Sequence, residues 1–117
     1  MPRPTVVVFF GGTPSNHDLS MESGSWVCRY LPRARYRVAP IRVTPEGYWQ
    51  VPLGMLPQQG SVDQVLERLW QAVPAVTPAA GVERLLARQP RAFLTLLRGH
   101  GGDDGAMQNL GATLGVP

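Results

Sequence analysis

The 117-residue chain contains no lysine, since all eleven of its basic residues are arginine. That absence excludes a P-loop that grips phosphates with lysine, a Schiff-base enzyme and a Ser–Lys dyad. Charged residues are scarce as well, at 16% of the chain against about 25% in an average protein. Glycine and proline are abundant instead, with 13 and 12 residues, which excludes an all-helical bundle and predicts many turns.

Cysteine is almost absent: Cys28 stands alone, which excludes a disulfide framework and a cysteine metal cluster. A nucleophilic thiol is one interpretation of Cys28, but a small buried residue of a helix is favoured. Long apolar runs are also missing, because Val6–Phe10 is too short for a signal peptide or a membrane span. The length predicts one domain, and a lone thiol is typical of a reducing compartment. We therefore expect a soluble, cytoplasmic protein that does not bind a membrane.

The order of apolar runs and turns predicts an α/β fold. Thr5–Phe10 is β-branched and aromatic throughout, which is typical of a parallel strand buried on both faces. Ser20 is expected to cap a helix that ends before Pro32, and Ser61-x-x-Gln64 is a capping box. The expected fold is a three-layer α/β sandwich with a mainly parallel, Rossmann-like sheet. Strands are predicted at 5–10, 35–43, 48–51 and 92–97, helices at 20–31, 62–73, 82–88 and 105–114, and a loop at 74–81.

The spacing of apolar residues also predicts the core. In the first helix, Trp26 and Tyr30 are part of an apolar set at helical spacing, so this face is expected to pack on the sheet. Apolar residues of the strands and of the helix after Ser61 complete the core. The expected core side chains are Val6, Val8, Phe10, Trp26, Tyr30, Val38, Ile41, Leu66, Leu69, Phe93, Leu94 and Leu96.

Two glycine-rich loops follow two of the predicted parallel strands. Gly11–Leu19 leaves the first strand, and Arg98–Asp104 leaves the last one. Ligands of open α/β sheets bind beyond the carboxyl ends of the strands, so both loops are expected to border one crevice. Glycines that only form tight turns are the simpler interpretation of either loop taken alone. Neither loop is a dinucleotide fingerprint, because Gly11-Gly12 lacks the spaced third glycine.

Metal binding and nucleic-acid binding are alternatives that the residues do not favour. No spacing among the histidines and nearby aspartates matches a known ligand set; these residues are His17, Asp18, His100, Asp103 and Asp104. The arginines from Arg29 to Arg42 could form a nucleic-acid patch, but aromatic residues are not interleaved with them. We therefore expect no metal and no nucleic acid, and a solvated basic face in that region.

A serine triad is a further alternative. Ser15 or Ser20 could combine with a histidine and an aspartate. Ser20 is better explained as a helix cap, and the sequence contains no nucleophile elbow.

The two loops and their flanks resemble the signatures of a known family. Phe9–Gly24, FFGGTPSNHDLSMESG, is similar to the first signature of D-alanine–D-alanine ligases, and Leu97–Gln108, LRGHGGDDGAMQ, is similar to the second. Arg42–Trp49 and Leu114–Pro117 also resemble segments of that family, so the resemblance covers nearly the whole chain. It implies that residues 1–117 form the N-terminal, substrate-binding domain of an ATP-grasp ligase of peptidoglycan synthesis.

The resemblance also implies a division of work between domains. The family's other domains hold ATP and magnesium and are expected to begin beyond Pro117, so this chain alone is expected to lack cofactors and catalytic residues and to be inactive. The family reaction phosphorylates the carboxylate of one D-alanine, and the amine of a second D-alanine attacks the acyl phosphate. The N-terminal domain holds the first D-alanine and helps to form a homodimer.

The resemblance assigns roles to residues of both loops. It implies that the substrate-binding residues are Asn16, Asp18, Leu19, Ser20, Arg98 and Gly99. It implies that the loops themselves are formed by Gly11, Gly12, Gly101, Gly102, Asp103, Asp104 and Gly105.

Two positions depart from the family pattern, which has glutamate at Asn16 and histidine at Arg98. Asn16 offers no charge to a substrate ammonium, and charge-assisted hydrogen bonds are about twice as strong as neutral ones. Arg98 is permanently cationic and suits a carboxylate or a phosphate. Three interpretations stay open: a ligase of altered specificity, an authentic D-alanine–D-alanine ligase with compensating residues, and a non-catalytic ligase-like binding or oligomerisation domain.

Overall fold

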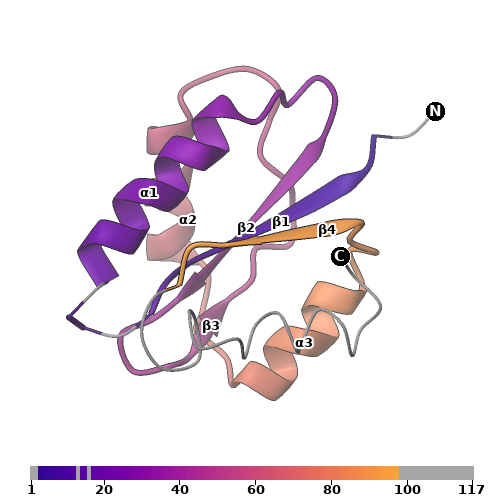
Figure 1. Ribbon diagram of the computed structural model, residues 1–117. Coiled ribbons are helices and arrows are strands. Elements are labelled where there is room, and N and C mark those ends of the chain that lie inside the picture. Colours follow the sequence, from indigo (N-terminus) through magenta and orange to yellow (C-terminus); the bar gives the residue numbers. More distant parts are fainter. Residues whose placement is uncertain (1–2, 13, 16, 98–117) are drawn as a thin grey trace.

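The computed structural model describes residues 3–12, 14–15 and 17–97. Within them the chain forms four strands and three helices (Figure 1), and the expected α/β fold with a mainly parallel sheet is confirmed. The helix predicted at 105–114 lies outside the described residues. The elements are β1 (Thr5–Gly11), α1 (His17–Tyr30), β2 (Arg37–Val43), β3 (Trp49–Gln50), α2 (Val62–Ala72), α3 (Pro78–Leu86) and β4 (Ala92–Thr95).

The sheet has the strand order β3-β2-β1-β4. The central strand β1 pairs in parallel with β2 on one side and with β4 on the other, so that Val8 lies between Pro40 and Leu94. Strand β3 adds a short antiparallel edge, with Arg42 opposite Gln50. All seven residues of β1 are buried, because the strand has a neighbour on each side and helices over both faces.

Alternate residues of β1 contribute to two cores, one on each face of the sheet. Val7 and Phe9 belong to the core beneath α3, where the Phe9 ring meets Trp49 edge-on at 5.2 Å between centroids. Phe10 belongs to the core beneath α1 and α2, where it meets Trp70 edge-on at 5.6 Å. The helices therefore cover both faces of the sheet (Figure 1), which is the expected three-layer arrangement.

Small residues let α1 approach the sheet closely. Its buried positions are His17, Ser20, Gly24 and Cys28, which recur at the helical spacing of one face. A Cβ on Gly24 would lie only 2.2 Å from Cγ of Phe10, so glycine is required at this crossing. The side of α1 that faces the sheet is thus small and partly polar, and bulkier residues flank it.

The prediction that Trp26, Tyr30 and Leu94 belong to the core is wrong. Trp26 is 53% exposed and Tyr30 is 66% exposed, because the small-residue face of α1 points inward instead. The two rings stack on each other with centroids 4.2 Å apart. Leu94 is 39% exposed on β4, an edge strand of the sheet. The other predicted core residues are buried or half-buried: Val6, Val8, Phe10, Val38, Ile41, Leu66, Leu69, Phe93 and Leu96.

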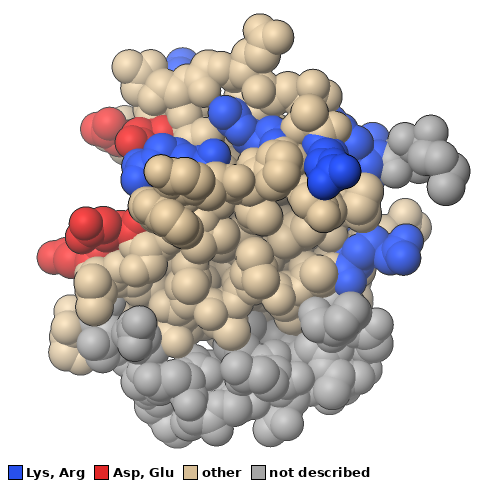
Figure 2. Space-filling model, turned by 45° about the horizontal axis from the view of Figure 1, so that its top comes forward, with Lys and Arg blue, Asp and Glu red and all other residues tan. Residues whose placement is uncertain are grey.

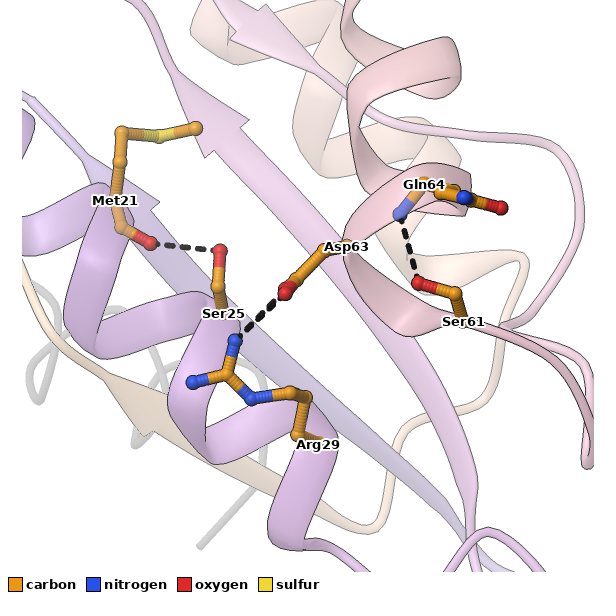
Figure 3. Close-up of polar contacts among 6 residues, drawn as sticks. All are labelled: Met21, Ser25, Arg29, Ser61, Asp63 and Gln64. Atoms are coloured by element: carbon orange, nitrogen blue, oxygen red, sulfur yellow. Dashed lines mark hydrogen bonds and ion pairs between the residues drawn. The ribbon is translucent and has the colours of Figure 1, made fainter.

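The caps of α2 and α3 show how these helices begin. Ser61 caps α2 as predicted, since its hydroxyl accepts a hydrogen bond from the Gln64 amide at 3.4 Å (Figure 3). The loop predicted at 74–81 is wrong in its second half, because α3 begins at Pro78. Thr77 caps that helix by accepting from the Ala80 amide at 3.3 Å. A Thr-Pro pair is a typical helix start, with threonine at the N-cap and proline at the first helical position.

Strand β2 is shorter and more buried than the alternating pattern predicts. It begins at Arg37 instead of Arg35, because Arg35 and Tyr36 belong to a turn in which the Pro32 carbonyl accepts hydrogen bonds from both of their amides. Pro40 lies inside the strand, yet no ladder bond to β1 is lost. The backbone groups of Val38 and Arg42, two residues before and after Pro40, point away from β1. The Val38 carbonyl accepts from the Leu56 amide, and Arg42 pairs with Gln50 of β3. The missing N–H of Pro40 therefore faces the same outer side, as proline in a sheet requires.

The two edge strands of the sheet are shorter than predicted. Strand β3 spans two residues instead of four, and β4 ends at Thr95, although the Leu96 amide still donates to the Phe9 carbonyl at 2.8 Å. Within the described part of the chain, the helices are too short and too polar to cross a membrane.

Candidate functional site

The glycine turn after β1 is tied to the end of β2. Gly11 and Gly12 both have positive φ, at 100° and 93°, a backbone conformation that glycine adopts without strain. The Gly12 amide donates to the Val43 carbonyl at 2.8 Å. A Cβ on Gly11 would approach that same carbonyl oxygen to 2.2 Å. The two glycines therefore allow the chain to turn directly against the neighbouring strand.

Ser20 ties the same turn to the end of β4. Its hydroxyl accepts a hydrogen bond from the Gly11 amide at 2.9 Å and donates to the Leu96 carbonyl at 2.6 Å. The side chain is fully buried, so neither bond competes with water. The prediction that Ser20 is an N-cap is wrong, because α1 begins three residues earlier, at His17. Ser20 instead connects the carboxyl ends of β1 and β4.

His17 connects the turn to β2 and β3. Nδ1 of the ring lies 3.2 Å from the Gly12 carbonyl oxygen, and Nε2 lies 3.2 Å from Nη2 of Arg42. Arg42 also donates from Nη1 to Oε1 of Gln50 at 2.6 Å. Gln50 continues the network by donating to the carbonyls of Trp70 and Val73, at the end of α2. Side chains from α1, β2 and β3 thus share one chain of hydrogen bonds.

The partners of His17 define its tautomer. Arginine has donors and no acceptor, so the Nε2 atom that faces Arg42 must be the acceptor. Nδ1 then carries the proton and donates it to the Gly12 carbonyl. Arg42 therefore orients the imidazole, and the imidazole holds the second peptide of the glycine turn.

The predicted site residues between Gly11 and Ser20 that the structure describes fall into two groups. Gly11, Gly12 and Ser20 lie at the junction of β1, β4 and α1. Asp18 and Leu19 lie in the first turn of α1 and are exposed, Leu19 by 54%. The other predicted site residues lie outside the described residues: Asn16, Arg98, Gly99, Gly101, Gly102, Asp103, Asp104 and Gly105.

The structure gives no support to a serine triad built on Ser20 and His17. The Ser20 hydroxyl donates its proton to a backbone carbonyl, and both nitrogens of His17 are engaged by Gly12 and Arg42. Among the described residues, no group of three histidine, cysteine, aspartate or glutamate side chains could hold a metal ion. His100, Asp103 and Asp104, which the metal alternative also used, lie outside them.

Sequence reasoning did not identify Arg42 and Gln50 as part of this region. In the sequence, Arg42 belongs to a basic cluster, two other members of which have partners elsewhere: Arg29 bonds Asp63 at 2.8 Å between α1 and α2 (Figure 3), and Arg33 donates to the Pro57 carbonyl. The sequence did offer a signal for them, because Arg42 and Gln50 are polar residues on two adjacent, largely apolar strands. Gln50 is buried, and buried polar side chains need partners.

These contacts place the glycine turn at the point where the direction of strand order reverses. The chain passes from β1 to β2 on one side, and later returns to β4 on the other side of β1. Open α/β sheets bind ligands at such a switch point, beyond the carboxyl ends of the strands. The amino end of α1 faces the same edge, and the helix dipole there favours an anionic group. The arrangement suits a small polar ligand.

A comparison with protein families agrees with this geometry. The family described as "D-ala D-ala ligase N-terminus" matches residues 5–117. The chain belongs to this family. The D-alanine–D-alanine ligase signatures described from the sequence are thus confirmed as a family relationship, and the chain is an N-terminal domain of that family.

Curated relatives of this D-alanine–D-alanine ligase N-terminal domain carry the ligase name. The D-alanine–D-alanine ligase of Clostridium novyi is 28% identical over 115 residues, which are 98% of this chain and 32% of that protein. The enzyme of the same name from Rhodococcus jostii is 31% identical over 137 residues, 99% of this chain and 35% of that protein. The chain thus spans about a third of the length of the curated relatives it matches.

Solved structures confirm the fold of the ligase N-terminal domain. The VanG D-Ala:D-Ser ligase from Enterococcus faecalis superposes with a TM-score of 0.70 at 17% identity, over 99% of this chain and 35% of that one. The D-alanine–D-alanine ligase from Coxiella burnetii gives a TM-score of 0.67 at 19% identity, over 100% of this chain and 35% of that one. At these identities the likeness concerns the fold.

Proposed function

We propose that this domain holds the first substrate of an ATP-dependent carboxylate–amine ligase of the D-alanine–D-alanine ligase type. The observation that carries the proposal is the glycine turn at the switch point of the sheet, which Ser20 and His17 hold by hydrogen bonds to Gly11 and Gly12. A substrate at this edge would meet a rigid turn, the amino end of α1 and the exposed side chain of Asp18. The family relationship supplies the reaction class.

Each site residue has a proposed role within this function. Asn16, Asp18, Leu19, Arg98 and Gly99 would contact the substrate. Ser20 is better suited to positioning, because its one proton is already donated to the Leu96 carbonyl. The loop-forming residues of the second signature are proposed to belong to the same site, because they follow β4 in the sequence.

ATP and magnesium are assigned to other domains of the parent protein. The chain has no lysine to bind nucleotide phosphates. Its described residues contain no cluster of three or more histidine, cysteine, aspartate or glutamate side chains that could hold magnesium. When bound elsewhere in the parent, ATP would supply the phosphoryl group that activates the first carboxylate. The part of this domain would be to bind and orient that substrate, so the isolated chain should be inactive.

Altered substrate specificity is part of the proposal and rests on the sequence at two positions. Asn16 and Arg98 replace an acidic and an imidazole side chain in the family pattern, which removes a partner for an ammonium and adds a fixed cation. A substrate with a carboxylate and no free α-ammonium group fits this change better than D-alanine.

The test is ATP-dependent phosphate release by the parent protein with D-alanine. We expect a high KM for the first D-alanine in the wild type, and better turnover in the double variant Asn16→Glu, Arg98→His than in either single variant. The two changes should be coupled, because a new glutamate near Arg98 could form an ion pair with it and fill the site. Ordinary turnover of D-alanine by the wild type would refute altered specificity and leave a true D-alanine–D-alanine ligase. No ATP hydrolysis with any amino acid, or with any carboxylate that lacks an α-ammonium group, would refute the ligase function.

Self-association through α1 is a second part of the proposal. Leu19, Trp26 and Tyr30 are each more than half exposed and follow one face of the helix. A hollow of about 390 Å³ between Leu19, Trp26 and Leu96 adjoins this face. An exposed apolar surface of this kind is typical of a contact between proteins, and we assign it to a homodimer of a cytoplasmic ligase.

A further inference from the structure

A second hollow lies at the opposite edge of the sheet from the glycine turn. Its volume is about 520 Å³, and it is bordered by Thr5 at the start of β1, Arg37 at the start of β2 and Arg91 just before β4. These strand ends lie toward the N label in Figure 1. Along β1, the six steps from Thr5 to Gly11 correspond to about 20 Å. The hollow is therefore separate from the proposed substrate site.

Backbone hydrogen bonds hold the three strand ends around this hollow together. The Arg37 amide donates to the Pro4 carbonyl at 2.9 Å, and the Arg91 amide donates to the Thr5 carbonyl at 2.8 Å. The positions from which these two side chains project are thus set by the sheet itself. A binding site built on such positions is already organised before its ligand arrives.

Within the described part of the chain, no carboxylate lines the hollow. Four arginines line it: Arg3, Arg37, Arg88 and Arg91. Arg3 donates to the Arg33 carbonyl and Arg88 donates to the Pro52 carbonyl. The guanidinium groups of Arg37 and Arg91 have no hydrogen-bond or ion-pair partner among the described residues, and both residues are exposed. This hollow therefore carries a concentrated positive charge.

No ion pair among the described residues neutralises the arginines of this hollow. Arg29 on α1, by contrast, is ion-paired with Asp63 at 2.8 Å. In Figure 2, basic side chains extend over the upper part and right edge of the visible face, and acidic ones gather at its left edge. Like charges that face one hollow repel each other and disfavour the compact state. Burial also lowers the pKa of Arg88 from its ordinary value, so an anion would relieve a cost that the fold already carries.

We propose that this hollow binds a small anion with two or more phosphate groups. The planar guanidinium group donates in pairs to phosphate oxygens, and arginine is favoured wherever such recognition occurs. The volume lies within the range of small-molecule sites, which is about 300–1,000 Å³. Four cations exceed what a single monovalent group needs. Among the residues that the structure describes, no aromatic side chain lines the hollow, so they offer none of the stacking surfaces by which proteins hold single-stranded nucleic acid.

Tripolyphosphate is a suitable probe, titrated into the chain by calorimetry at a fixed ionic strength. We expect one site, with Arg37→Gln and Arg91→Gln each weakening binding by about tenfold, the effect of one lost charge-assisted interaction. Arg68→Gln removes the same charge from α2, outside the hollow, and should change the affinity by less than about twofold because exposed, distant charges are screened. Thermal melts of all variants would verify that they fold.

Amide chemical shifts provide an independent readout of where the anion binds. Tripolyphosphate should shift the amides of Thr5, Arg37 and Arg91, and leave those of Gly11 and Gly12 unchanged. Equal weakening by Arg68→Gln, shifts at the glycine turn, or no saturable binding would overturn the proposal. Citrate that binds as tightly as tripolyphosphate would overturn the assignment to phosphate, and tighter binding of single-stranded RNA that Arg37→Gln abolishes would overturn the assignment to a small molecule.

Discussion

The hydroxyl of Ser20 donates to the carbonyl of Leu96 at 2.6 Å, across 76 residues of sequence. With its second bond, from the Gly11 amide at 2.9 Å, it joins the carboxyl ends of two parallel strands to the first turn of α1. A serine can both donate and accept, which few small side chains can do. One hydroxyl thereby connects the three elements that border the proposed substrate site.

Ser20→Ala should therefore destabilise the domain. The change leaves the buried Gly11 amide and Leu96 carbonyl without their partner, at a cost of about 1–3 kcal/mol. Chemical denaturation measures the difference. Ser25→Ala is the matched control, because the Ser25 hydroxyl bonds the Met21 carbonyl within its own helix (Figure 3), and it should change stability by less than about 0.5 kcal/mol. Equal effects of the two changes would contradict the role given to Ser20.

Gly24→Ala should destabilise the domain through overpacking. The new Cβ would meet the Phe10 ring at 2.2 Å, so α1 or the ring must move, which typically costs about 1–3 kcal/mol. Gly54→Ala is a suitable control, because no atom of the described residues lies within 4 Å of a Cβ there. That change should be neutral or stabilising by a few tenths of a kcal/mol, since it restricts the unfolded chain. A Gly24→Ala protein as stable as the wild type would show that α1 does not cross β1 this closely.

The tautomer of His17 can be observed directly. Nitrogen-15 spectra of the imidazole should show a protonated Nδ1 and an unprotonated Nε2, because Arg42 donates to Nε2. Arg42→Gln should alter this preference, whereas Arg35→Gln, in the turn before β2, should not. A spectrum with the proton on Nε2 in the wild type would contradict the hydrogen-bond chain from Gln50 to the glycine turn.

Cys28 should be unreactive in the folded protein. Burial raises the pKa of its thiol from 9.0 to about 12, and the nearby positive charge of Arg33 offsets only part of this effect. Thiolates are the reactive species, so a thiol reagent at pH 8 should label the native chain far more slowly than the unfolded chain. Because this is the sole cysteine, the labelling rate reports on one site.

The same shift in pKa predicts how stability changes in alkali. Above pH 9 the unfolded thiol loses its proton while the folded thiol keeps it, so the unfolded state binds fewer protons and stability falls as the pH rises toward 12. Cys28→Ala should remove this contribution, and the difference between the two stability profiles isolates it from the tyrosines. Parallel profiles over pH 9–12 would show that the thiol is accessible to solvent.

Trp26→Gln should weaken the proposed homodimer. A large exposed aromatic residue at a protein contact commonly contributes enough to change the dissociation constant by about tenfold or more. Sedimentation equilibrium of the chain measures this constant. Tyr48→Gln is the control, because Tyr48 is 49% exposed, follows the turn before β3 and does not border the hollow beside Trp26. A wild type that stays monomeric at millimolar concentration would contradict self-association through this domain.

The sequence by itself determined the fold class, the order of most elements and the family. The continuous apolar run of β1 predicts a strand buried on both faces, and the cap at Ser61 predicts where α2 begins, because both signals depend on residues close together in the chain. The two loop signatures, FFGGTPSNHDLS and LRGHGGDDG, identify the family through local sequence alone.

Only the tertiary structure decided which face of α1 points inward. Periodicity favoured the larger apolar residues, including Trp26 and Tyr30, but the space over β1 is taken by the Phe10 ring and admits only small side chains such as Gly24. The roles of Ser20 and His17 likewise depend on partners far away in sequence, the Leu96 carbonyl and Arg42. A serine near a helix start has the same local signal whether it caps that helix or bonds a distant strand. Its partner is chosen by packing.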